Sequence, residues 1–233
     1  MSDRVEQKLA HLDQETDRLL RTCRGLAAAD AHRDTLCEGW DAAHLLSHVA
    51  RNAEALSNLV LWAQDGVERE AYTSPEQREA DIEAGAALPW DRIVEDVEVT
   101  AARFRELAQS LTGPAGDAEV RTRTGNVVRG HQVISMRINE VVLHHVDLAA
   151  GHDVDDSDPG WLGRTLRQGA QRWDALPDAP SLTLVPEGLD PVPIGGGGPV
   201  VAGTPGELLL WLARGRDTGL RTEVELPTPP PWA

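Results

Sequence analysis

The chain has 233 residues, enough for one large domain or two small ones, and 41% of them are hydrophobic, so a buried core can form. Its formal net charge of −16 gives a surface that repels phosphate backbones, which argues against a nucleic-acid partner. No apolar run approaches the roughly 18 residues that span a bilayer, so we expect no membrane partner. The N-terminus is charged from its third residue, which is unlike a signal peptide, and Cys23 and Cys37 form no metal or redox motif. We therefore expect a cytoplasmic protein with reduced thiols.

Helical periodicity runs through the first two-thirds of the chain. Apolar residues recur at steps of three and four from about residue 3 to 26, which predicts a first helix. A second helix is expected from about 41 to 65, with Asp41 as its N-cap and Gly66 at its end. Ser74 and Pro75 then have the residue types that begin a short helix.

Two further long helices follow. One is expected to begin near Pro89 or Asp91 and to end at Gly113 and Pro114. The other fits from about 130 to 150 and stops at Gly151. The segment between them, residues 115–129, is polar and contains glycine, which predicts a loop or a short pair of strands.

The composition changes after this last helix. One more helix, in "SDPGWLGRTLRQGAQRWDALP", precedes the short β-like runs "SLTLVPEG", "DPVPIGGGGPVVAGTP" and "GLRTEVELP", with the helix "PGELLLWLARGR" between two of them. We therefore predict a mainly α fold. It consists of a four-helix bundle in residues 1–154, followed by a small C-terminal α+β domain in residues 155–233.

The candidate chemistry lies in "RINEVVLHHVDLAAG", residues 137–151. Glu140 and His144 are four residues apart and share one helix face, and Asp147 continues that face, whereas His145 points about 100° away. Two ligand-type residues at this spacing can grip one metal ion, although the same pattern also occurs on solvated helix faces.

The second helix offers a partner for this pair. His44 and His48 are also four residues apart, and one of them would complete a site of two histidines and a glutamate with an open fourth position. In a helical bundle, ligands from separate helices converge in the core. The competing interpretation is that His44 and His48 form an ordinary surface pair.

The two ligand-bearing segments, "GWDAAHLLSHVARNAEAL" and "RINEVVLHHVDLAAG", resemble those of the mycothiol-dependent maleylpyruvate isomerases, which belong to the DinB-like metal-binding four-helix superfamily. The resemblance continues through "NLVLWAQDGVEREAYTSPEQREADIEAG" and into the tail, so it covers nearly the whole chain. Many DinB-like thiol transferases share the ligand segments, whereas "YTSPEQR" and the C-terminal domain point to the isomerase branch.

The resemblance implies a zinc ion held by His48, Glu140 and His144, with His44 supporting a ligand or merely structural. It also implies a functional arginine after the "LLLW" helix, which is Arg216 here, or Arg214 in an alternative register. We expect Asp147 to orient a ligand or a substrate group rather than to bind zinc. This last expectation rests on its place on the ligand face.

The implied activity is the mycothiol-dependent isomerisation of maleylpyruvate to fumarylpyruvate in gentisate degradation. Zinc would hold an external thiol as thiolate, and an arginine would bind a carboxylate of the small anionic substrate. The alternatives are a mycothiol S-transferase acting on another electrophile, in detoxification or natural-product biosynthesis, and a non-catalytic regulator on the same scaffold. The sequence leaves the oligomeric state open.

Overall fold

The computed structural model of the chain describes residues 2–232 and divides after His152 into two compact units. The division falls two residues before the predicted domain boundary. The predicted fold class is confirmed: the chain is mainly helical with small sheets, a helical bundle followed by an α+β unit. Among residues 2–232, no helix combines the length and the apolar character needed to cross a bilayer.

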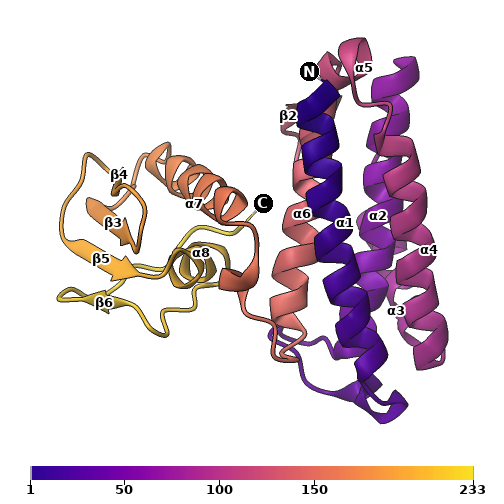
Figure 1. Cartoon of the computed structure of the whole chain (residues 1–233), viewed down its shortest axis with the longest axis horizontal. Coiled ribbons are helices and arrows are strands. Elements are labelled where there is room, and N and C mark those ends of the chain that lie inside the picture. Colours follow the sequence, from indigo (N-terminus) through magenta and orange to yellow (C-terminus); the bar gives the residue numbers. More distant parts are fainter. Residues whose placement is uncertain (1, 233) are drawn as a thin grey trace. The chain divides into compact units, whose positions relative to one another are not determined.

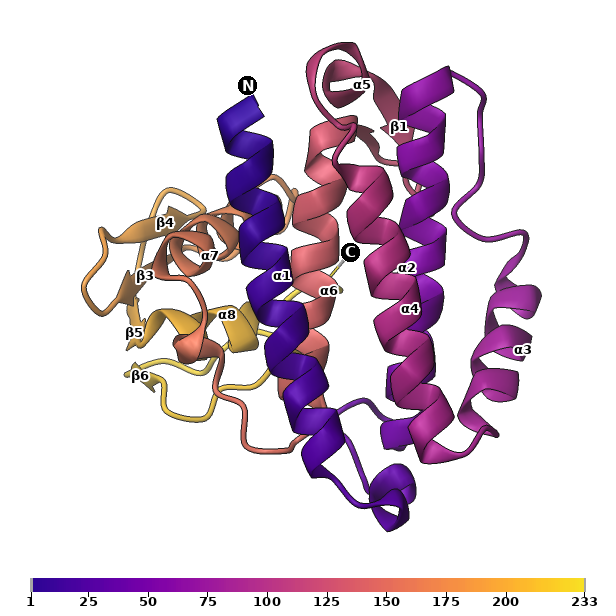
Figure 2. The same cartoon turned by 45° about the vertical axis from the view of Figure 1, so that its right-hand side comes forward.

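Four long helices form the first unit and run side by side in both views (Figures 1 and 2). They are α1 (Ser2–Gly25), α2 (Ala42–Asp65), α4 (Trp90–Ala108) and α6 (Gly130–Asp147). α2 packs against α4 and α6, and α1 packs against the same two helices from the other side. Their apolar stripes meet in a core that includes Leu19, Leu46, Phe104 and Ile134, each fully buried.

Shorter elements complete this unit. They are the 3-10 helix η1 (Ala28–His32), the helices α3 (Pro75–Ala86) and α5 (Gly113–Asp117), and the antiparallel strands β1 (Glu119–Arg121) and β2 (Val127–Arg129). α3 lies along α2, outside the four long helices (Figure 2). The two helices approach closely at Gly85, since a Cβ atom there would lie 2.2 Å from Ser47 Oγ. The Ser47 hydroxyl also joins the helices by donating a hydrogen bond to the Ile82 carbonyl.

The predicted helix caps of α2 and α3 are confirmed. The Asp41 carboxylate accepts a hydrogen bond from the His44 backbone N–H, and Gly66 ends α2 in the left-handed region, with φ of 74°. Ser74 caps α3 in the same way, by accepting from the Gln77 backbone N–H, and Pro75 follows at the first turn.

The predicted end of the third long helix is wrong. α4 ends at Ala108 rather than at Gly113, and the separate helix α5 begins there. The Leu107 carbonyl accepts a hydrogen bond from the Ser110 hydroxyl at 2.8 Å and another from the Gln64 side chain of α2. Side chains therefore satisfy a carbonyl that the next helical turn would otherwise occupy.

The second unit is an α+β layer with its own core. It contains η2 (Val154–Asp156), α7 (Pro159–Asp174), α8 (Pro205–Arg214), and the strands β3 (Leu182–Pro186), β4 (Val192–Ile194), β5 (Val200–Gly203) and β6 (Arg221–Thr222). The strand order is β4-β3-β5-β6, with β3 and β5 parallel and the other pairs antiparallel. Trp173 of α7 and Trp211 of α8 pack with ring centroids 5.3 Å apart in this core.

Candidate metal centre

Three side chains that the sequence singled out converge between α2 and α6. His48 comes from α2, one turn after the His44 position, and Glu140 and His144 come from one face of α6. Their potential ligand atoms all lie within 4.8 Å of one another. His48 and His144 are nearly buried, whereas the Glu140 side chain keeps 34% of its exposure, so the cluster is open to a small molecule on one side.

The spacing of these atoms matches a tetrahedral metal site. Glu140 Oε2 lies 3.3 Å from His48 Nε2 and 3.5 Å from His144 Nε2. Zinc bonds of about 2.0–2.1 Å, arranged tetrahedrally, separate neighbouring ligand atoms by roughly 3.3–3.5 Å. Two imidazoles and one carboxylate also form a donor set that zinc uses in catalytic sites. The residues present therefore fit a zinc ion with one position left open.

The surroundings favour the ionised form of Glu140 and the protonated form of His144. Burial by itself would raise the pKa of Glu140, but hydrogen bonds and charges from His144 and His48 outweigh it and hold that pKa well below its usual value. Burial would lower the pKa of His144, but hydrogen bonds to Asp147, Cys37 and Glu140 raise it well above its usual value. Burial lowers the pKa of His48 and dominates there. The cluster thus presents an ionised carboxylate and, on His48, an unprotonated imidazole.

Asp147 lies directly behind His144. Its carboxylate is fully buried, and Oδ2 lies 3.0 Å from His144 Nδ1. A carboxylate at this nitrogen fixes the tautomer and orientation of a histidine whose other nitrogen binds a metal. This geometry supports the orienting role expected for Asp147.

Cys37 is a neighbour that sequence reasoning missed. Its Sγ lies 4.0 Å from His144 Nδ1, and Cys37, His144 and Asp147 form a second group with the spacing of metal ligands. Cys37 lies on the segment between η1 and α2, where no helical or strand periodicity locates it. The nearby Leu36 backbone N–H donates to the Asp147 carbonyl, which holds this segment against the end of α6.

Arg137 fixes the position of α6 against α2 at the level of the cluster. It is 1% exposed, one turn before Glu140, and its Nη1 donates to the Val49 carbonyl at 2.8 Å and to Asn52 Oδ1 at 2.9 Å. Burial lowers its pKa to about 10. Because Val49 follows His48 directly, this buried arginine helps to set the height at which ligands from the two helices meet.

Trp40 and Arg78 lie beside His48, and Arg78 also contacts Tyr72. The Trp40 ring lies 5.1 Å from the His48 ring. Arg78 of α3 places Nη2 3.2 Å from His48 Nδ1, and its guanidinium carbon lies 5.7 Å from the Trp40 ring and 5.6 Å from the Tyr72 ring. Sequence reasoning assigned no site role to Tyr72 or Arg78, although both lie in the "YTSPEQR" segment that carried part of the family resemblance.

The remaining histidine neighbours do not join the cluster. His44 places Nδ1 2.6 Å from Asp41 Oδ1 and Nε2 3.3 Å from Glu83 Oε2, so it ties the start of α2 to its own cap and to α3. His145 faces α1, with Nε2 2.7 Å from Thr22 Oγ1. Arg214 and Arg216 belong to the second unit, on either side of Gly215, which ends α8 in the left-handed region.

Comparisons with known proteins show the family and fold of the chain. Residues 12–149 match the profile of the mycothiol maleylpyruvate isomerase N-terminal domain. A crystal structure described as the mycothiol-dependent maleylpyruvate isomerase is 30% identical, covers 98% of this chain and 97% of its own, and superposes with a TM-score of 0.90. A histidine-to-alanine mutant of that isomerase gives the same identity and coverage with a TM-score of 0.89. A comparison with curated protein sequences gives no match.

Proposed function

Because the chain belongs to the mycothiol maleylpyruvate isomerase family, we propose that it catalyses the mycothiol-dependent cis–trans isomerisation of maleylpyruvate to fumarylpyruvate, a step of gentisate degradation in the cytoplasm. The observation that carries the proposal is the cluster of His48, Glu140 and His144, whose spacing fits zinc with an open position. A zinc ion held there would leave one position for the sulfur of mycothiol.

His48, Glu140 and His144 would hold the zinc ion, which lowers the pKa of a coordinated thiol and keeps it as the nucleophilic thiolate. Asp147 acts through His144: its Oδ2, 3.0 Å from Nδ1, keeps the ring proton on that nitrogen and leaves Nε2 free as a ligand. Burial around His48 favours its neutral form, which a ligand must have.

The reaction needs a temporary loss of double-bond character in the substrate. The thiolate adds to one alkene carbon, a carbon–sulfur bond forms, and the π electrons move toward the conjugated carbonyl as an enolate. Rotation about the resulting single bond follows. The enolate then expels the thiolate and restores the alkene in the trans geometry, so the thiol is not consumed. We assign to Arg216, with Arg214 as the alternative, the binding of a substrate carboxylate and the stabilisation of the enolate charge.

Arg78 must change its partner when the metal binds. Its contact with His48 requires an unprotonated Nδ1, whereas a neutral His48 that binds a metal through Nε2 carries its proton on Nδ1. We therefore expect the Arg78 guanidinium to leave Nδ1 on zinc loading. A zinc titration followed by the ¹⁵N chemical shifts of the His48 ring tests this, since an Nδ1 that stays unprotonated in the loaded protein contradicts it.

The functional test is an assay of purified, zinc-loaded protein with maleylpyruvate, with and without mycothiol. Turnover should require mycothiol and should collapse in His48→Ala. His44→Ala is the matched control, because it removes a histidine one turn away on the same helix whose partners are Asp41 and Glu83. Mycothiol should be recovered unchanged after many turnovers. A stable conjugate that accumulates instead identifies a mycothiol S-transferase, and turnover without any thiol rejects the mechanism.

A further inference from the structure

A pocket of about 710 Å³ lies on the first unit beside the metal centre. The segment between α2 and α3, the first turns of α3, and the turn between β1 and β2 form its walls. We call it the arginine pocket, because it is lined by four arginines: Arg69, Arg78, Arg121 and Arg123. Its volume lies within the range of about 300–1,000 Å³ that is typical of small-molecule sites.

The arginine pocket adjoins the metal centre at Arg78. Arg78 and Tyr72 line the pocket, and Arg78 also contacts His48 at 3.2 Å. The Arg78 guanidinium carbon also lies 5.6 Å from the Tyr72 ring, so these two residues of the pocket wall contact each other. The pocket wall therefore contacts one of the candidate metal ligands directly.

The pocket reaches residues that lie well away from the metal centre along α2. It extends to Trp62, in the last turns of α2, whereas the metal centre lies at His48. Fourteen helical residues separate the two, which corresponds to roughly 20 Å along the helix axis. A small diacid such as maleylpyruvate is too short to span this distance, but a thiol carried on a two-ring group is not.

The polar groups of the pocket favour an uncharged, hydroxyl-rich occupant. Its four arginines are balanced by four glutamates, Glu68, Glu70, Glu76 and Glu79. Guanidinium groups only donate hydrogen bonds and carboxylates only accept them, whereas each hydroxyl of a polyol does both. A pocket built for a dianion would instead show an excess of donors and positive charge.

Two of the arginines keep their donors available. Arg121 and Arg123 are exposed, and neither side chain forms an ion pair or hydrogen bond with another residue in the described part of the chain, 2–232. Arg69, in contrast, is held by Asp65 through two contacts of 2.7 Å.

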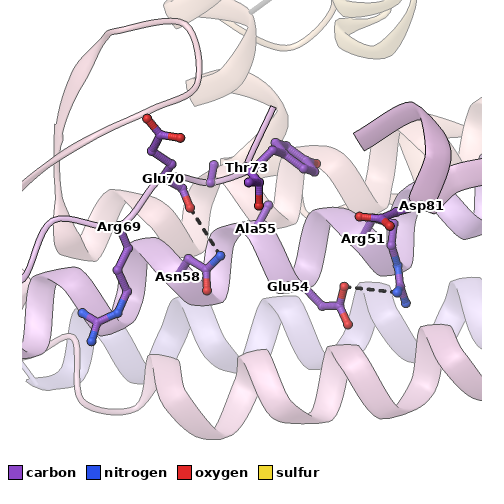
Figure 3. Close-up of a pocket in the computed structure, with 10 residues that line it drawn as sticks. Arg51, Glu54, Ala55, Asn58, Arg69, Glu70, Thr73 and Asp81 are labelled. Atoms are coloured by element: carbon purple, nitrogen blue, oxygen red, sulfur yellow. Dashed lines mark hydrogen bonds and ion pairs between the residues drawn. The ribbon is translucent and has the colours of Figure 1, made fainter. Parts of the chain in front are cut away.

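A neighbouring pocket of about 480 Å³ shares the segment from Arg69 to Thr73 with the arginine pocket (Figure 3). There Arg51 is already engaged, at 2.5 Å from Asp96 and 3.2 Å from Glu54. Open arginine donors at the turn between β1 and β2 therefore distinguish the arginine pocket from this neighbour.

We infer that the arginine pocket binds the polyhydroxylated part of the thiol cosubstrate, the glucosaminyl-inositol of mycothiol, and that Arg121 and Arg123 donate hydrogen bonds to its hydroxyls. The identity of the thiol rests on the proposed function, but the chemical class of the occupant rests on the pocket itself. The thiol end then points past Tyr72 and Arg78 toward the open position beside Glu140.

The test uses N-acetylglucosaminyl-inositol, an uncharged probe that lacks the thiol and so has no strong zinc ligand. Calorimetry of the full-length protein should show millimolar or tighter binding. The variant Arg121→Ala/Arg123→Ala should weaken that binding about tenfold, the effect of losing two hydrogen bonds to neutral groups. The control is Arg129→Ala, which removes an exposed arginine from the same hairpin but outside the pocket. It should bind the probe as the parent protein does.

Steady-state kinetics separates the two possible occupants. The double variant should raise the KM for mycothiol about tenfold and leave the KM for maleylpyruvate unchanged. The inference is overturned if the parent protein does not bind the probe, if the double variant binds it as tightly as the parent, or if only the KM for maleylpyruvate rises. A protein that binds the probe through Arg121 and Arg123 but does not isomerise maleylpyruvate retains this inference and loses the proposed function.

Discussion

Adjacent histidines on α6 occupy opposite environments. His144 faces the cluster, between the carboxylates of Glu140 and Asp147, and they raise its pKa well above the usual value. His145 faces α1 and stacks on His152 with ring centroids 3.8 Å apart, and it contacts no carboxylate among residues 2–232. Burial, followed by the charges of His152, Arg18 and Arg21, lowers the pKa of His145 to about 3.

The difference shows what one step along a helix can do. A rotation of about 100° takes the side chain from a carboxylate-lined opening into a contact between two packed helices. The same imidazole then serves as a candidate ligand in one position and as a neutral packing group in the next. If the two faces differ in this way, substitutions of His144 and His145 should have different effects on zinc binding.

The largest effect should come from removing a ligand on the cluster face. His144→Ala should weaken zinc binding by more than about a hundredfold, beyond the 10–100-fold that supporting residues contribute. His145→Ala should change zinc affinity less than about threefold, because His145 points to Thr22. Competition with a chromogenic chelator measures both.

His144→Ala also leaves the buried Asp147 carboxylate without this partner, so thermal melting must show that the variant is folded. Glu140→Ala removes a second proposed ligand, whose side chain is only half-buried, and should weaken zinc binding to a similar extent. Equal zinc affinity in the His144 and His145 variants contradicts the assignment of the ligand face.

Asp147→Asn should have the next largest effect. The amide cannot stabilise the proton on His144 Nδ1 as a carboxylate does, so zinc affinity should fall about 10–100-fold. The expected change is in affinity, with stoichiometry kept at one ion. If affinity is unchanged, Asp147 only supports the local fold.

The buried histidine should make stability depend on pH. The unfolded chain takes up a proton at His145 below pH 6.5, but the folded chain does so only near pH 3, so this contribution to stability is lost as the pH falls between these values. At pH 5 the loss is on the order of 2 kcal/mol in the free energy of unfolding.

Urea denaturation of metal-free protein at neutral pH and at pH 5 measures this contribution. In His145→Gln the acid-dependent loss should shrink by that amount. His144 should act with the opposite sign: its raised pKa stabilises the fold below pH 6.5, and this contribution disappears as the pH rises through its folded value. An unaltered pH dependence in His145→Gln rejects a neutral, buried His145.

The smallest effect should come from Cys37→Ser. Cys37 Sγ lies near His144 Nδ1, on the side of the ring away from Glu140, so zinc held by His48, Glu140 and His144 should keep its affinity within about threefold. If zinc instead used Cys37, His144 and Asp147, the loss would match that of His144→Ala. Comparing these two variants therefore decides which nitrogen of His144 is the ligand.

The sequence predicted the helices well where one strong local signal marked each end. Asp41, Gly66 and Ser74 act as caps because each needs only its own neighbouring backbone. The end of α4 could not be predicted, because the Leu107 carbonyl accepts hydrogen bonds from the side chains of Ser110 and of Gln64, which lies on another helix. Periodicity carries no information about such a contact.

The candidate site was predicted in part for the same reason. Glu140, His144 and Asp147 share a face by helical geometry alone, so their proximity followed from spacing. His44 and His48 were equivalent by spacing, and tertiary contacts distinguish them. Glu83 of α3 contacts His44, whereas His48 contacts Glu140 of α6 and Arg78 of α3.

By itself, the sequence determined the mainly helical fold, most of the element types and which side chains of α6 share one face, since these follow from periodicity, capping and composition within short stretches of chain. Only the tertiary structure decided that His48 meets that face, that Cys37 and Arg78 lie beside it, and that Arg121 and Arg123 join Tyr72 around one pocket. These residues are far apart in the chain, and the packing of helices on a shared core, not any local rule, brings them together.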